Sequence, residues 1–265
     1  MIQAEARVVD IDRVCLPGFS RTEGRGVESS RTITLSCPEI TRKARPGQFV
    51  MVNCGDDTLP RPFSISRITE NGELSLYFAV LEDGSGTKWL AERKPGDIIK
   101  IIGSLGNGFT IGKTSHNILL VAGGMGIAPL IFLAEEATRN GIVVTLMYGT
   151  QNKDRYPVER VLPGVNIIKA TEDGSAGHHG LITELIPEYL DKADQIFICG
   201  PLAMYKYVHH QDVLKGKQAQ ISLEVRMACG RGICYGCTIQ TVNGKKRVCE
   251  DGPVFDFHDI DWDRI

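Results

Sequence analysis

This sequence of 265 residues has few aromatic residues, no large excess of either charge and no long apolar run. Phe, Trp and Tyr make up 7% of it, and 30 Lys and Arg residues are nearly balanced by 32 Asp and Glu, for a formal net charge of −2. This balance gives no electrostatic reason to expect a nucleic-acid partner. The sequence also lacks an apolar run long enough for a membrane span, and its first residues lack the apolar core of a signal peptide. Composition therefore predicts a folded cytoplasmic protein.

The eight cysteines do not form the framework of a small disulfide-stapled domain. Four of them are scattered among strand-like segments, which suits a reducing cytoplasm. These four are Cys15, Cys37, Cys54 and Cys199.

The other four cysteines lie close together near the C-terminus, in the order C-x4-C-x2-C-x11-C. They are Cys229, Cys234, Cys237 and Cys249. This is the thiolate spacing of a plant-type [2Fe–2S] site, and glycines inside the loop allow backbone N–H groups to approach the sulfur atoms. Structural zinc in a non-catalytic scaffold is the alternative, but zinc usually takes two short C-x2-C knuckles and this segment has one. The spacing therefore favours an iron–sulfur cluster.

The rhythm of the sequence changes twice along the chain, which predicts three segments. Residues 1–110 hold short β-rich runs separated by Pro-Gly and Asn-Gly turns, the pattern of an antiparallel β-barrel. Residues 111–215 alternate apolar runs with helical stretches, the pattern of a Rossmann-like parallel α/β sheet. Residues 216–265 carry the cysteine loop and are too short to bury a core alone, so this subdomain depends on its cluster and its neighbours.

Within the second segment, individual elements can be placed from their patterns. Asn117–Val121 and Val143–Met147 are apolar runs of strand length. Ile127–Arg139 and Leu181–Tyr189 have the apolar periodicity of helices.

A glycine-rich turn joins the first of these strands to the first helix. Gly123, Gly124 and Gly126 lie where backbone N–H groups could approach a pyrophosphate, and the helix dipole would add to the attraction. The turn departs from the G-x-G-x-x-G fingerprint, so close packing of the chain is an alternative explanation for the glycines.

Two segments of the predicted barrel also offer groups that suit a phosphate. Arg61-Pro-Phe-Ser64 provides a guanidinium group, a ring and a hydroxyl group at the entry to a strand. Gly84-Ser-Gly-Thr87 precedes a helical stretch and is a potential anion site, although Thr87 could equally be a plain N-cap.

Cys199-Gly-Pro201 ends a predicted strand at the carboxyl edge of the sheet, where α/β proteins bind ligands. As a small apolar side chain, Cys199 could equally belong to the core. His178 and His179 are adjacent, so their side chains point in different directions and make a poor metal pair.

Taken together, these motifs resemble those of the ferredoxin reductase superfamily, in order and spacing, over nearly the whole chain. Within it, the cysteine loop, the ending Arg247-Val-Cys-Glu-Asp-Gly-Pro-Val-Phe255 and the segment Ser104–Phe109 are similar to the electron-transfer subunits of B-type dihydroorotate dehydrogenase. Two positions depart from the family pattern, since Phe78 stands where a basic residue is expected and Ser104 where proline is expected.

The resemblance implies three cofactors and a partner. FAD would be held by Arg61, Pro62, Phe63, Ser64, Phe78, Ala79, Val80, Gly86 and Thr87. The turn at Gly123, Gly124 and Gly126 would bind NAD, with Cys199 near the nicotinamide. The [2Fe–2S] cluster on Cys229, Cys234, Cys237 and Cys249 would lie between this FAD and the FMN of a separate catalytic subunit, which oxidises dihydroorotate to orotate in pyrimidine biosynthesis. The two subunits would form a heterotetramer of two copies each.

On this reading no side chain has to act as an acid or a base, because a flavin exchanges hydride with NADH and single electrons with a cluster. Arg231, Ile233 and Tyr235, between the cysteines, become candidate contacts with the partner. The same cofactors would serve an NAD(P)H-ferredoxin or sulfhydrogenase-type subunit, so that alternative stays open. The choice between NADH and NADPH also stays open, since only Lys153 and Arg155 offer a base near the expected ribose site.

Overall fold

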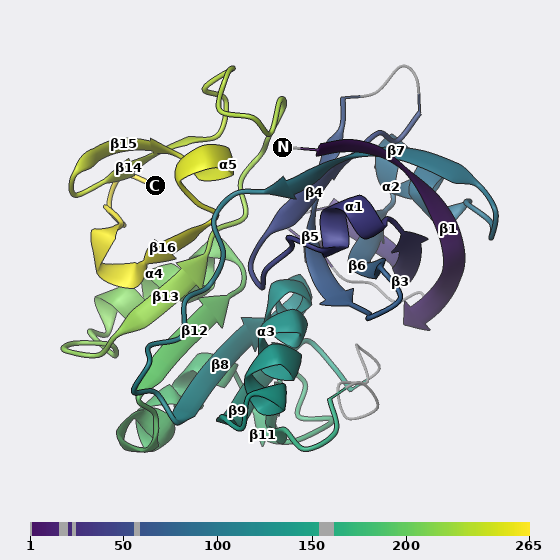
Figure 1. Ribbon diagram of the computed structural model, residues 1–265. Coiled ribbons are helices and arrows are strands. Elements are labelled where there is room, and N and C mark those ends of the chain that lie inside the picture. Colours follow the sequence, from purple (N-terminus) through teal and green to yellow (C-terminus); the bar gives the residue numbers. More distant parts are fainter. Residues whose placement is uncertain (1, 16–20, 23–24, 56–58, 154–161) are drawn as a thin grey trace.

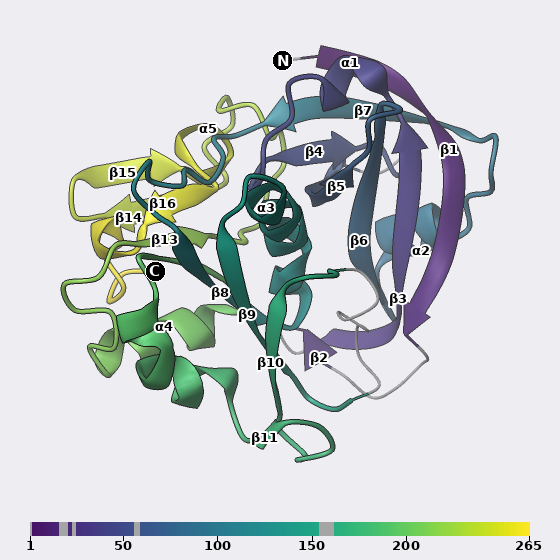
Figure 2. The ribbon, with the colours of Figure 1, turned by 60° about the horizontal axis from the view of Figure 1, so that its bottom comes forward.

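The computed structural model describes residues 2–15, 21–22, 25–55, 59–153 and 162–265. These residues form an antiparallel β-barrel, a mostly parallel α/β sheet beside it, and a small lobe that carries the cysteine loop (Figures 1 and 2). The predicted fold class is therefore confirmed. No helix in the described part of the chain is both long and apolar enough to cross a membrane.

Six strands close the barrel and a short one extends it. They are β1 (Ile2–Cys15), β2 (Arg21–Thr22), β3 (Arg25–Ser36), β4 (Phe49–Val52), β5 (Arg61–Ile68), β6 (Glu73–Leu81) and β7 (Ile98–Leu105). All pairings are antiparallel in the order β1-β7-β4-β5-β6-β3-β2, and the pairing of β1 with β3 closes the ring. Alternate side chains point inward, so Ile33, Leu35 and Ile65 are fully buried. Two short helices, α1 (Pro38–Thr41) and α2 (Ser85–Ala91), complete this part.

The second sheet has the strand order of a dinucleotide-binding fold. Its strands are β8 (Asn117–Gly123), β9 (Val143–Thr150), β10 (Asn166–Thr171), β11 (His178–His179), β12 (Gln195–Cys199), β13 (Ala219–Ser222) and β16 (Val254–Asp256). They follow the order β11-β10-β9-β8-β12-β13-β16, parallel except for the last pair. The direction of winding reverses between β8 and β12, which is where such sheets bind ligands.

Helices cover both faces of this sheet. The 3₁₀ turn η1 (Gly124–Gly126) leads into α3 (Ile127–Arg139), which lies between the sheet and the barrel (Figure 1). Arg67 of β5 forms an ion pair with Glu135 of α3, with Nε 2.8 Å from the carboxylate oxygen, and so links the two parts. The helices η3 (Ile182–Lys192) and α4 (Leu202–His210) lie on the other face.

Two helix predictions had different outcomes. The helix predicted over Ile127–Arg139 is confirmed at both ends as α3. The helical stretch predicted over Leu181–Tyr189 is present as η3, which runs from Ile182 to Lys192 and is a 3₁₀ helix with Pro187 inside it. Proline has no backbone N–H to donate and its ring disturbs the α-helical pattern.

The small lobe leaves the second sheet after β13 and returns to it. Its elements are the hairpin β14 (Thr238–Thr241) and β15 (Gly244–Arg247), the helix α5 (Val248–Asp251), and η4 (Phe257–Asp259) after β16. Strand β16 pairs with β13, and Trp262 stacks on Tyr205 of α4 with ring centroids 5.5 Å apart. The exact boundaries of the three segments stay a prediction.

Candidate functional site

Backbone N–H groups of the loop donate to the sulfur atoms of Cys229 and Cys234. Arg231 N and Cys234 N donate to Cys229 Sγ at 3.4 and 3.5 Å, and Gly236 N donates to Cys234 Sγ at 3.5 Å. Burial would raise the pKa of Cys229, but the backbone N–H groups of Arg231 and Cys234 outweigh it and lower this pKa to about 6. The loop thus stabilises a thiolate at this position before any metal binds.

The other two cysteines form a second, more buried pair. Cys249 N donates to Cys237 Sγ at 3.4 Å, and Gly232 N donates to Cys249 Sγ at 3.1 Å. Burial and the neighbouring Cys237 thiol raise the pKa of Cys249 to about 12. No three His, Cys, Asp or Glu side chains in the described ranges surround a single ion-sized point. A [2Fe–2S] cluster takes two ligands on each iron, so two thiol pairs with N–H donors fit this group.

Gly230 fixes where the cysteine loop sits on the barrel. Its φ of +63° lies in the left-handed region, and a side-chain carbon there would be 2.5 Å from Met51 Cγ. Only glycine meets both conditions without strain. Met51 belongs to β4 and lies opposite Pro62 of β5, so the loop packs one strand away from the segment Arg61–Ser64.

The segment Arg61–Ser64 begins strand β5 beside the start of α2. A side-chain carbon at Gly86 would lie 3.3 Å from Arg61 Cγ, so the first turn of this helix packs directly on the arginine. Thr87 Oγ1 accepts from Leu81 N at 3.1 Å and donates to Gly84 O at 3.2 Å. The N-cap is Gly84, so Thr87 lies inside the helix and the plain N-cap prediction for it was wrong.

Phe78 explains one departure from the family pattern. It is buried inside the barrel, where its ring meets Phe63 edge-on with centroids 5.5 Å apart. The next residue, Ala79, points to the opposite face and lines a cleft between the barrel and the α/β sheet. Any ligand contact of Phe78 on that face therefore has to come from its backbone, which any residue could supply.

This cleft, of about 390 Å³, is where the glycine turn meets the barrel. Gly123, Gly124 and Gly126 line it together with the end of β9 and the Gly200-Pro201 turn that follows β12, and Ser30, Tyr77 and Ala79 line it from the barrel. The two explanations given for these glycines, close packing and the approach of a phosphate, apply to different residues of the turn. A side-chain carbon at Gly126 would lie 2.2 Å from Cys199 O, so this glycine serves close packing, whereas one at Gly124 would meet nothing within 4 Å.

Cys199 lies beneath the cleft rather than in it. It is fully buried, Gly200 and Pro201 line the cleft in its place, and burial raises its pKa well above the ordinary value. Its Sγ donates to Ser222 O at 3.5 Å, and the Tyr205 hydroxyl donates to the same oxygen at 2.8 Å. The same Tyr205 hydroxyl group accepts from Gly200 N at 2.9 Å, so these buried bonds position the Gly200-Pro201 turn.

Sequence patterns missed several residues of these sites. Glu172 and Glu224 line the cleft, and Thr183, which lines it too, has a buried hydroxyl group with no partner among the described residues. Nothing local marks these positions, because each follows a strand or turn whose end is known only from the fold. Of the two bases named for a 2′-phosphate, Lys153 is exposed at the end of β9, and Arg155 lies outside the described residues.

Comparison with known proteins gives two family matches. Residues 28–109 match the oxidoreductase FAD-binding domain, and residues 224–261 match the iron-sulfur cluster binding domain of dihydroorotate dehydrogenase B. The chain is 38% identical over 239 residues to the dihydroorotate dehydrogenase B (NAD(+)) electron transfer subunit of Caldanaerobacter subterraneus, covering 86% of this chain and 94% of that one. It is 39% identical over 221 residues to the subunit of the same name from a Geobacillus species, covering 79% and 84%.

Among solved structures, a chain of an NADH-dependent reduced ferredoxin-NADP oxidoreductase studied for flavin-based electron bifurcation is similar, with a TM-score of 0.84 and 27% identity over 98% of this chain and 91% of that one. A ferredoxin NADP+ reductase from Neisseria gonorrhoeae, solved with FAD and NADP, shares the fold at a TM-score of 0.63 and 16% identity, over 85% and 95% of the two chains.

Proposed function

Because the chain belongs to the family of electron transfer subunits of dihydroorotate dehydrogenase B, we propose that it carries electrons between a catalytic partner subunit and NAD⁺. Its FAD-binding and iron–sulfur domains are those of an oxidoreductase that works in electron transfer for pyrimidine biosynthesis. The partner proposed is an FMN-containing subunit that oxidises dihydroorotate, in a cytoplasmic heterotetramer of two copies of each subunit.

The observation that carries this proposal is the packing of Gly230 on Met51. It brings the cysteine loop within one strand of Arg61–Ser64, and the strand after that, β6, reaches the cleft through Ala79. Three candidate binding regions therefore lie side by side across β4, β5 and β6. A linear relay of redox groups requires this order.

When bound, FAD exchanges hydride with a nicotinamide and single electrons with an iron–sulfur cluster. The chain's own residues hold and orient these groups. Arg61 would pair with the FAD phosphates beside the first turn of α2, and Phe63 and Ser64 would position the ring system. Gly124 would admit the NAD pyrophosphate to the start of η1, and the two cysteine pairs would hold the cluster.

The test is purification of the chain with its proposed partner. Coexpression with a dihydroorotate-oxidising FMN subunit should give a complex with one FAD and two irons per chain, and dihydroorotate should then reduce NAD⁺. A chain that carries zinc without iron or flavin, or that never associates with such a subunit, would refute the proposal. Replacing Arg61 with lysine should lower FAD content, whereas replacing the exposed Arg42 with lysine should not.

A second candidate function is that of an NAD(P)H-ferredoxin type subunit in another complex. The similarity to the NADH-dependent reduced ferredoxin-NADP oxidoreductase, which extends over 98% of this chain, favours it. The two functions differ in the partner. Recovery of the native chain with a large iron–sulfur subunit instead of an FMN dehydrogenase would select this second function.

A further inference from the structure

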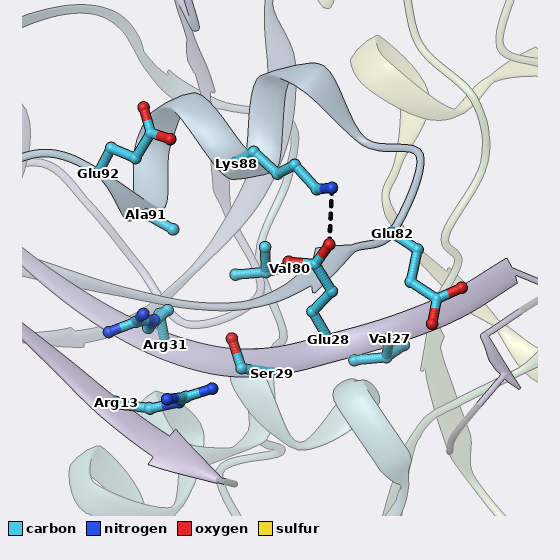
Figure 3. A pocket seen from close by; sticks show the side chains of 10 residues that line it. All are labelled: Arg13, Val27, Glu28, Ser29, Arg31, Val80, Glu82, Lys88, Ala91 and Glu92. Atoms are coloured by element: carbon cyan, nitrogen blue, oxygen red, sulfur yellow. Dashed lines mark ion pairs between the residues drawn. The ribbon is translucent and has the colours of Figure 1, made fainter. Parts of the chain in front are cut away.

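A second cavity opens at the end of the barrel and shares one lining residue, Val27, with the cleft. It measures about 600 Å³ and is lined by strands β1, β3 and β6 and by α2 (Figure 3). Its charged and hydroxyl groups include Arg13, Ser29, Arg31 and Lys88. The Lys88 ammonium group is already neutralised, since it lies 2.6 Å from a carboxylate oxygen of Glu28.

Arg13 and Arg31 present two guanidinium groups to the same space. They are direct partners in the register of β1 and β3, so their side chains leave the sheet side by side, and Figure 3 shows them together next to Ser29. No ion pair or hydrogen bond joins either side chain to another described residue, and the Nε atom of Arg31 is buried without a partner. Two like charges directly opposite each other on paired strands destabilise the pairing. A bound anion would remove this repulsion.

None of the described carboxylates that line the cavity forms an ion pair with Arg13 or Arg31. Glu28 is paired with Lys88, and Glu82 lies at the far end of the cavity from the two arginines (Figure 3). Glu92 extends from α2 and forms no ion pair with a described residue. Two guanidinium groups thus stand against one unpaired carboxylate, so the arginine end of the cavity carries a net positive charge.

The cavity is separated from the corner where Arg61 would bind the flavin phosphates. Gly86 packs on Arg61, while Lys88, Ala91 and Glu92 face the cavity. At 100° per residue, these three positions lie on the side of α2 opposite Gly86. The helix itself, about 10 Å across with its side chains, stands between the two places.

We propose that Arg13 and Arg31 bind the phosphate group of a small molecule other than the chain's own FAD. A guanidinium group matches two phosphate oxygens with paired N–H donors, and two such groups suit a dianion. The buried Ser29 hydroxyl group adds a further polar contact at the same end. A cavity of this volume accepts a ligand of the size of a mononucleotide.

The test uses the full chain loaded with FAD and cluster, at constant ionic strength in a chloride buffer, with inorganic phosphate and inorganic pyrophosphate as probes. Calorimetry should show saturable binding of one probe molecule per chain. Arg31→Gln and Arg13→Gln should each weaken binding at least tenfold, whereas Arg42→Gln, an exposed arginine outside the cavity, should leave it unchanged. Without a probe, Arg31→Gln should melt no lower than the unchanged protein, because like-charge repulsion is relieved.

The proposal is overturned if binding does not saturate, or if Arg42→Gln weakens it as much as the cavity variants do. It is also overturned if the cavity variants keep phosphate binding but lose FAD, because that would assign the two arginines to the flavin. Should Arg31→Gln fail to fold, the more exposed Arg13→Gln carries the same comparison.

Discussion

Asn107 joins the barrel to the small lobe, and its replacement by alanine tests how strongly the two are coupled. Its Nδ2 group donates to Asp251 O at 3.1 Å and to Val254 O at 2.8 Å, and its Oδ1 atom accepts from Val254 N at 3.0 Å. Alanine removes all three bonds. At about 1 kcal/mol for each, Asn107→Ala should lower the free energy that holds the lobe in place by about 3 kcal/mol.

Native-state hydrogen exchange measures this local loss directly. Since ~1.4 kcal/mol corresponds to a factor of ten, the Val254 amide should exchange roughly a hundredfold faster in the variant. Asn166→Ala is the matched control, because Asn166 is exposed and its amide makes a bond to Thr145 Oγ1 at 3.3 Å on the surface of the sheet. It should change stability by less than about 0.5 kcal/mol. If Asn107→Ala also stays within that limit, the side-chain bonds do not couple lobe and barrel, and the reasoning is wrong.

Three further predictions concern the cysteine loop and the cleft. In cluster-free protein at pH 7, iodoacetamide should modify Cys229, with its pKa of about 6, at least a hundredfold faster than the buried Cys54, whose pKa burial raises to about 11; equal rates in peptide mapping would contradict this. Tyr235→Asp should weaken partner association about tenfold without loss of iron, because the Tyr235 ring is 65% exposed and the Arg247 guanidinium group lies 4.9 Å from its centroid. Unchanged partner binding would remove Tyr235 from the interface. Glu172→Lys should raise kcat/KM for NADPH relative to NADH by about tenfold, since it replaces a repulsive charge in the cleft by an attractive one; an unchanged ratio of the two steady-state values would place the adenosine end elsewhere.

The sequence predicted well what is encoded by local spacing. The helix Ile127–Arg139 and the cysteine loop were both readable because periodicity and ligand spacing act over a few residues. Contacts between distant segments were not readable. The packing of Gly230 on Met51 depends on the closure of the barrel, and the pairing of Arg13 with Arg31 depends on a strand register that no local pattern specifies.

The expected basic residue at position 78 and the placement of Cys199 show a second limit. A motif names the residue type at a site but not the direction of its side chain. Phe78 points into the barrel, and Cys199 is buried behind Gly200 and Pro201 rather than facing the cleft. Both directions follow from strand alternation once the core face of each strand is known, and the sequence alone left that face undetermined.

The lobe is fastened to the molecule at both ends, since the chain enters it from β13 and comes back as β16 on the edge of the same sheet. A lobe attached at both ends does not rotate about a single flexible linker, so the shape of the whole chain determines which partner surface the cysteine loop can approach. Truncating the protein before Val254 would do more than shorten it. The unpaired side of β13 would be left as an open sheet edge, ready to recruit a strand from a neighbouring molecule, and aggregation should appear together with the loss of iron.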